Sequence, residues 1–219
     1  MRYLPVMLDL AGRSVLVVGG GAVATRKARR LLEAGAHVRV VAVEATESLR
    51  DLADSEDRLE LHLRGYRDGD LDGVSLAFTA TGRRAVDEAV SAAAGRAGLW
   101  VNAADDLANC SFLMPAMLER GRLQVSVSTG GASPALASRV RDEVDSALGP
   151  EYQVAADLLG ELRSSLPAGA ARGRAFAGLL DDGLLEALRQ GDERRVARMA
   201  DQARRGLVRA ASRGGDGDG

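Results

Sequence analysis

The sequence is poor in the residues that usually hold metal ions or form disulfide bridges. Its 219 residues include one cysteine and two histidines. A single thiol cannot form an intramolecular disulfide, and so few soft ligands argue against a structural zinc or haem site. The charge is nearly balanced, with 29 basic residues, 31 acidic residues and a net charge of −2. We therefore expect no permanent metal centre and no general attraction to nucleic acid or to an anionic membrane.

Long apolar runs are also lacking. The longest run near the N-terminus, residues 15–21, is too short to cross a membrane, and charged residues interrupt the chain before it. The sequence therefore predicts neither a signal peptide nor a transmembrane helix, and it favours the cytoplasm. Hydrophobic residues still make up 46% of the chain and charged residues 27%, which is typical of a folded globular protein. This length has room for one α/β domain and a smaller appendage.

The first half of the chain alternates strand and helix patterns. Short apolar runs, most of them β-branched, predict five strands at residues 14–19, 37–43, 59–63, 74–80 and 99–103. Helical patterns at residues 22–34 and 84–97 lie between strands. Strands and helices that alternate at this spacing favour an α/β fold, a Rossmann-type doubly wound parallel sheet over residues 1–113.

The pattern changes in the second half. An alternating run at residues 123–128 predicts a half-exposed strand, and Ser133 followed by Pro134 predicts the start of a helix. Farther on, only helical patterns remain, at residues 151–166, 173–190 and 192–211. We expect three further parts: a small segment over residues 114–149, a helical domain over 150–211 and a disordered tail over 212–219.

Three glycines stand between the first predicted strand and the first predicted helix. Residues 19–24 read Gly-Gly-Gly-Ala-Val-Ala and match the dinucleotide-binding pattern G-x-G-x-x-A. In that pattern Gly19 makes the sharp turn, Gly21 lets the backbone approach a pyrophosphate, and Ala24 allows close packing of helix on strand. The helix N-terminus then faces the negative charge of the phosphates. The alternative at this point is a glycine-rich turn that binds no nucleotide.

Two acidic residues follow strands at positions where a dinucleotide would lie. Glu44 comes about 20 residues after the glycines, where a carboxylate accepts hydrogen bonds from the ribose of NAD. No arginine follows it immediately, which favours NAD over NADP, although Glu44 fits a solvated loop equally well. Asp105 follows the fifth strand, and the carboxyl ends of parallel strands surround the ligand crevice. It is a candidate acid or base; the alternative is a turn-capping role, which Asp106 fits better.

Five segments of the chain, taken in order, also carry a family resemblance. They are residues 4–10, 17–27, 101–105, 112–115 and 128–137. Together they resemble the precorrin-2 dehydrogenase/sirohydrochlorin ferrochelatase family, which includes the dehydrogenase domains of siroheme synthases. The resemblance implies an enzyme that oxidises precorrin-2 to sirohydrochlorin with NAD, and that in some members then inserts Fe²⁺, a substrate, to give siroheme. It also implies a homodimer that forms through the segment 114–149.

The resemblance assigns cofactor contacts and a catalytic group. By this resemblance the cofactor is held by Ala22 and Val23 after the glycines and by Val43 and Glu44 after the second strand. The family usually has proline at the position of Val43, so we expect a less rigid loop here. The family's catalytic aspartate falls on Asp105. We expect the nearby Cys110 to be a buried structural residue rather than a reactive thiol.

The tetrapyrrole that the resemblance implies carries many carboxylates, so a slightly acidic protein must gather positive groups locally. The helix start at Ser133 offers backbone donors and Arg139 offers a guanidinium, and both suit carboxylates. Thr129, followed by Gly130, takes the position of a serine that is phosphorylated in some family members. We expect these four residues to bind substrate, with a solvated helix face as the alternative for Arg139.

Two other functions stay open from the sequence. One is a dehydrogenase without chelatase activity, which would share Asp105 and the glycine-rich turn. The other is a non-catalytic Rossmann module that senses a nucleotide and regulates a partner. Such a module needs an acidic residue inside the end of the second strand, where this chain has Ala42 and Val43. It also gives no reason for the stretch 129–134, so we expect an oxidoreductase, with lyase activity added where the metal step occurs.

Overall fold

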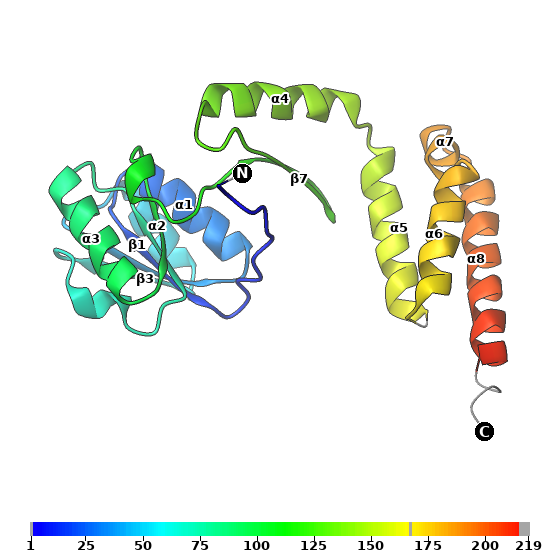
Figure 1. The fold of residues 1–219 in the computed structure, drawn as a ribbon, viewed down its shortest axis with the longest axis horizontal. Helices are drawn as coiled ribbons and strands as arrows, with labels where there is room; N and C mark the ends of the chain where they lie inside the picture. Colours follow the sequence, from blue (N-terminus) through cyan, green and yellow to red (C-terminus); the bar gives the residue numbers. More distant parts are fainter. Residues whose placement is uncertain (1, 167, 215–219) are drawn as a thin grey trace. The chain divides into compact units, whose positions relative to one another are not determined.

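The computed structural model describes residues 2–166 and 168–214. The chain divides into two compact units, Met1–Met114 and Pro115–Gly219; Figure 1 labels their α-helices and some of their strands. No helix in the described residues is both long and apolar enough to span a bilayer.

The first unit is built on a five-stranded sheet with the order β3-β2-β1-β4-β5. Its strands are β1 (Ser14–Val18), β2 (His37–Ala42), β3 (Leu59–Leu63), β4 (Leu76–Thr79) and β5 (Trp100–Ala103). Each neighbouring pair is parallel. The chain winds outward from β1 first to one side and then to the other, which confirms the Rossmann-type doubly wound sheet. Ligands of such sheets bind at the carboxyl ends of the strands, near the point where the order reverses.

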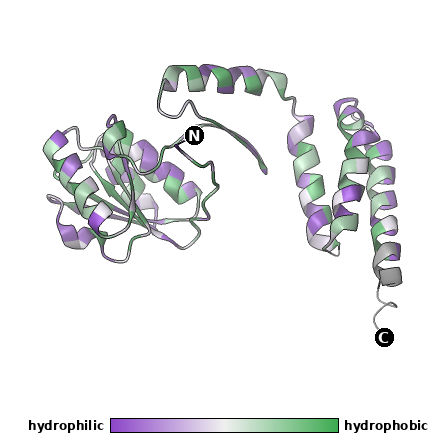
Figure 2. Cartoon of the chain, viewed as in Figure 1, coloured by the Kyte–Doolittle hydropathy of each residue, from purple (hydrophilic) through white to green (hydrophobic). Residues whose placement is uncertain are grey.

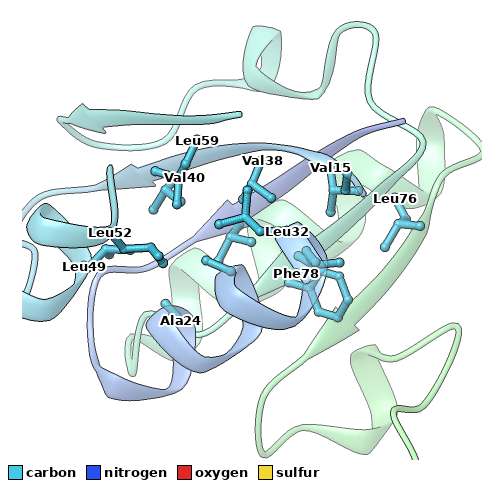
Figure 3. Close-up of a cluster of buried hydrophobic side chains, with 14 residues drawn as sticks. Val15, Ala24, Leu32, Val38, Val40, Leu49, Leu52, Leu59, Leu76 and Phe78 are labelled. Carbon is cyan, nitrogen blue, oxygen red and sulfur yellow. The ribbon is translucent and has the colours of Figure 1, made fainter. Parts of the chain in front are cut away.

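Helices cover both faces of this sheet. Along β1 the side chains of Val15 and Val17 point to one face, and those of Leu16 and Val18 point to the other. The first face packs against α1 (Ala22–Glu33) and α2 (Glu47–Ser55), as Figure 3 shows. The second face packs against α3 (Arg84–Arg96). Two short 3-10 turns, η1 (Asp68–Leu71) and η2 (Leu107–Asn109), complete the unit.

The second unit begins with a hairpin of β6 (Ala116–Arg120) and β7 (Leu123–Val127). Helix α4 (Pro134–Ala147) contacts both strands. Ser133 caps this helix as predicted, because its hydroxyl accepts a hydrogen bond of 3.1 Å from the Leu136 N–H. The Arg120 Nη2 donates a 2.6 Å bond to Asp145 and so ties β6 to the end of α4.

Four helices follow, and they share an apolar core. They are α5 (Glu151–Ser165), α6 (Ala170–Asp181), α7 (Leu184–Arg189) and α8 (Glu193–Gly214). Figure 2 shows hydrophobic and hydrophilic residues interleaved along them, as amphipathic helices require. The segment 173–190 is helical as expected, and Gly183, whose backbone is left-handed with φ 90°, divides it between α6 and α7. A disordered tail is expected from residue 212, but residues 212–214 still belong to α8. Residues 215–219 lie outside the described part of the chain.

Candidate active site

The glycine-rich turn between β1 and α1 is wedged against two loops. A Cβ atom on Gly19 would lie 2.7 Å from the carbonyl carbon of Ala80, just after β4, and φ of Gly19 is 129°. A Cβ on Gly20 would lie 2.9 Å from the Cα of Ala45, in the loop after β2. Only glycine fits these two positions without displacing backbone. The turn is therefore held close to the ends of both neighbouring strands.

The third glycine faces open space instead. A Cβ on Gly21 would meet no atom within 4 Å, and Gly21 is the N-cap of α1 without a side-chain cap. The first N–H groups of a helix have no partner within the helix and attract anions. This arrangement fits the pyrophosphate of a dinucleotide. Ala22 and Val23, the next two residues, begin α1.

A hollow of about 300 Å³ opens beside the start of α1. Its lining combines hydroxyl groups with two arginines: Ala22, Thr25, Arg26, Arg29, Thr46 and Ser48. The hydroxyls of Thr25 and Thr46 are 3.2 Å apart, and the Arg29 Nη2 donates a 3.1 Å bond to Ser48. Hydroxyls and guanidinium groups suit the sugar and phosphate parts of a nucleotide. Val43 and Glu44 are exposed on the loop after β2 and do not line this hollow.

Asp105 stands after β5 in an unusual backbone conformation. Its φ is 59°, and it is the one non-glycine residue of the described chain with a positive φ. Such left-handed residues cost energy and cluster at functional sites. The side chain is exposed. Asp105 thus lies at the carboxyl edge of the sheet, as the sequence predicts, on a turn with a strained backbone.

Asp106, the next residue, has the capping role that the sequence predicts for it. Its carboxylate accepts bonds from the backbone N–H of Ala108 at 3.1 Å and from the side chain of Asn109 at 2.7 Å. The Asn109 side chain is the main reason that the pKa of Asp106 lies below its usual range. Asp106 therefore holds η2, and Asp105 is free of that task.

Cys110 lies beneath the same turn and is buried. Its sulfur accepts a 3.2 Å bond from the Ala103 N–H. Burial raises the pKa of the Cys110 thiol, which keeps it protonated and unreactive. The prediction of a buried structural cysteine is confirmed. The neighbouring Asn102 is also buried, and its Nδ2 donates a 3.0 Å bond to the Phe112 carbonyl.

One residue of this site was not selected by the sequence reasoning. The Lys27 Nζ, on α1, donates a 2.8 Å bond to the Asn102 Oδ1 at the end of β5 and lies 4.8 Å from the Phe78 ring centroid. Burial and, to a smaller extent, the Arg26 charge lower the pKa of Lys27, against the opposing effects of Cys110 and Asp105. A signal was present, since Lys27 is the single lysine among 29 basic residues.

The four residues expected to bind substrate belong to the second unit. The Thr129 hydroxyl accepts a 2.9 Å bond from the Ser133 N–H and donates a 3.0 Å bond to the Ser133 carbonyl. Gly130 has a left-handed backbone, φ 65°. Arg139 is exposed on α4 and forms a 2.9 Å ion pair with Glu143. The hydroxyls of Thr129 and Ser133 thus shape the turn before α4, and Arg139 lies on a solvated face.

Comparison with known proteins assigns the fold to a family. Residues 6–116 match the family described as "Putative NAD(P)-binding", and residues 120–147 match "Sirohaem biosynthesis protein central". The chain belongs to this NAD(P)-binding family. The match covers the sheet, the glycine-rich turn and Asp105.

Individual relatives confirm the resemblance seen in the sequence. The chain is 42% identical over 158 residues to a siroheme synthase of Ectopseudomonas mendocina, which covers 72% of this chain and 34% of that protein. It is 37% identical over 215 residues to the siroheme synthase of Methylococcus capsulatus, covering 96% of this chain and 44% of that protein. The NAD(P)-binding chain therefore spans less than half the length of these relatives.

A solved structure is similar over its whole length. The structure of SirC, a precorrin-2 dehydrogenase, matches with a TM-score of 0.75 and 29% identity, over 91% of this NAD(P)-binding chain and 100% of SirC.

No cluster of three or more His, Cys, Asp or Glu side chains able to hold a metal ion occurs in residues 2–166 and 168–214.

Proposed function

We propose that this chain oxidises precorrin-2 to sirohydrochlorin with NAD as the hydride acceptor. The observation that carries the proposal is the position of two features on one sheet. The glycine-rich turn follows β1 and Asp105 follows β5, with β4 between these strands, so both lie at the same edge. A dinucleotide binds across that edge in sheets of this kind. The full-length similarity to SirC, a precorrin-2 dehydrogenase, supports the same reaction.

The oxidation removes two hydrogens from the macrocycle. Gly19 and Gly21 would hold NAD, which would supply the acceptor for one hydrogen with its electron pair, a hydride; the other hydrogen leaves as a proton. The Asp105 carboxylate, at the strand end, accepts this proton as a general base. Asp106 keeps the turn in place through its bonds to η2.

The residues around the glycine-rich turn bind the nucleotide in this proposal. Gly19 and Gly21 bring the backbone and the start of α1 to the pyrophosphate, and Ala22 and Val23 continue that contact. Val43 and Glu44 hold the adenosine ribose from the loop after β2, and a carboxylate at Glu44 favours the free hydroxyls of NAD. Ala22, Val23 and Val43 come from the family resemblance alone, and Glu44 comes also from its spacing after the glycines.

A second step, Fe²⁺ insertion into sirohydrochlorin, is proposed on the names of the relatives, which are siroheme synthases. Insertion needs a base that takes pyrrole N–H protons and an oxygen ligand that delivers the incoming ion. Asp105 offers both in one exposed carboxylate. Fe²⁺ is a substrate in this step. A dehydrogenase without chelatase activity is the alternative, and it uses the same residue.

The second unit supplies substrate binding and dimer formation in this proposal. The start of α4 at Ser133 and the guanidinium of Arg139 bind substrate carboxylates beside Thr129 and Gly130. The segment 114–149 joins two chains, because its strand β7 leaves the apolar side chains of Leu123, Val125 and Val127 only partly buried, and a second copy of the chain would cover them. Sedimentation of the purified chain at micromolar concentration tests this, and a monomer would contradict it. We place the enzyme in the cytoplasm, in agreement with its single cysteine.

The test of the activity is an anaerobic assay of the purified chain with precorrin-2 and NAD. We expect NADH and sirohydrochlorin, each followed by its absorption spectrum. No NADH above the protein-free control would overturn the proposal and would favour a nucleotide sensor. Adding Fe²⁺ to sirohydrochlorin then tests the second step. A rate equal to the protein-free control would leave a dehydrogenase only.

A further inference from the structure

Lys27 differs from the other basic residues of α1. Arg26, Arg29 and Arg30 are exposed, whereas Lys27 is half-buried and its amine lies against the Phe78 ring and the Asn102 amide. A charged amine loses water when it is buried, and this loss of hydration raises the free energy of its charged form. The exposed arginines of the helix do not have this cost. Lysine also differs from arginine in carrying a compact charge that can titrate. The single lysine of the chain therefore places a titratable charge next to the end of β5.

The contacts of Lys27 lead directly to the turn that carries Asp105. Its partner Asn102 is buried and donates from Nδ2 to the Phe112 carbonyl at 3.0 Å and toward the Cys110 sulfur at 3.7 Å. Cys110 in turn binds the backbone of Ala103. These bonds fix both ends of the segment 103–110, in which Asp105 has its left-handed backbone.

We propose that Lys27 is a positioning residue for the oxidation, holding Asn102 at the end of β5 and keeping a positive charge on the side of Asp105. This inference rests on the proposed function. The charged groups that act on Lys27 are Arg26 on its own helix and Asp105 and Cys110 on the facing turn. At alkaline pH Lys27 loses its own proton, and the positive charge facing the Asp105 turn is lost with it.

Three variants separate this role from a structural one. Lys27→Met keeps an apolar stem over Phe78 but removes the donor and the charge; we expect kcat to fall roughly tenfold to a hundredfold. We expect its KM for NAD to stay within about threefold, because the glycine-rich turn is untouched. Lys27→Arg keeps a charge that does not titrate. It should recover most of kcat and lack the fall of wild-type kcat at alkaline pH. Arg30→Met, which removes an exposed charge from the same helix, is the control and should behave as wild type.

A second measurement needs no activity. Because Lys27 is the single lysine, a chain labelled with ¹³C-lysine gives one side-chain signal, whose pH titration reports this residue alone. We expect a midpoint below that of a free lysine, and a still lower midpoint in Asp105→Asn, where the carboxylate charge is gone.

The two measurements distinguish failure of the inference from failure of the proposed function. A wild-type chain that does not oxidise precorrin-2 refutes the function, and the NMR titration still tests the charge arrangement. An active wild type with unchanged kcat in Lys27→Met at every pH overturns the positioning role. A midpoint that is the same in wild type and Asp105→Asn overturns the electrostatic link between the two residues.

Discussion

A Cβ atom on Gly19 would overlap the carbonyl oxygen of Ala80 and lie 2.7 Å from its carbonyl carbon. The turn after β1 and the loop after β4 therefore touch at a point where no side chain fits. Gly19 also has a φ of 129°, which L residues rarely adopt. Gly19→Ala is expected to destabilise the chain by about 1–3 kcal/mol from backbone strain, with the overlap added. Urea unfolding measures the loss.

Gly169→Ala is the matched control for this change. Gly169 has a similar φ, 137°, but a Cβ there would meet no atom within 4 Å. It therefore reports the strain without the overlap. Equal losses in the two variants would show that the contact with Ala80 is unimportant.

Gly21 is expected to respond in the opposite way, because its Cβ would point into open space and its φ is −82°. Gly21→Asp places a carboxylate at the N-cap of α1, which should leave stability unchanged or raise it by a few tenths of a kcal/mol. The same charge would repel a pyrophosphate, so NAD binding should be abolished. Calorimetric titration with NAD measures this, with Gly21→Asn as a cap that carries no charge. Normal NAD affinity in Gly21→Asp would move the nucleotide elsewhere.

Asp105 can be tested without disturbing its backbone. Asparagine tolerates the left-handed conformation that Asp105 adopts, φ 59°, whereas alanine does not. We expect Asp105→Asn to lower kcat by about 10²–10⁴, the usual contribution of a general base, with NAD affinity nearly unchanged. Asp106→Asn keeps a capping side chain at the start of η2 and should retain activity. Turnover at the wild-type rate in Asp105→Asn would remove this residue from the mechanism.

The sequence predicted the first unit well because its signals are local. A run of buried residues that ends in glycine marks β1, and Asp106 is followed by the turn that it caps. Helix α2 was not assigned, since its nine residues bury only Leu49 and Leu52 and give too short a period to recognise. In the same way, no strand is predicted at β6, because its pairing with β7 is not visible in its own residues.

The part of the site that the sequence did not predict depends on tertiary packing. Lys27 and Asn102 are 75 residues apart and meet only because the Lys27 side chain, on α1, extends over Phe78 of β4 to the end of β5. The direction of the Lys27 side chain, toward the interior, differs from that of Arg26 and Arg30 on the same helix. The hydrophobic periodicity of this helix does not distinguish Lys27 from Arg26 and Arg30. The sequence shows that Lys27 is the single lysine among many arginines, but the composition of the chain does not show which residue Lys27 contacts.

The helical part of the second unit contains a carboxylate with a predictable response to acid. Glu151, at the start of α5, is buried, and Arg189 of α7 donates to it from Nε at 3.2 Å and Nη2 at 2.8 Å. Its own backbone N–H and then Arg189 hold the pKa of Glu151 below its usual range. A carboxyl whose pKa is lower in the folded chain stabilises it above the unfolded pKa, about 4.3. That stabilisation is lost as the pH falls through the folded pKa.

Glu151→Gln should therefore lower the thermal midpoint at pH 7, where the carboxylate is ionised and bound to Arg189. The midpoints of wild type and variant should then converge as the pH falls from 5 toward about 2, because both side chains are neutral there. Circular dichroism melts of the full chain measure this difference, which removes the contribution of other carboxyls. Glu161→Gln, an exposed position on the same helix, is the control and should follow wild type at every pH. A difference that is as large in acid as at pH 7 would mean that packing, and not the ion pair, accounts for the role of Glu151.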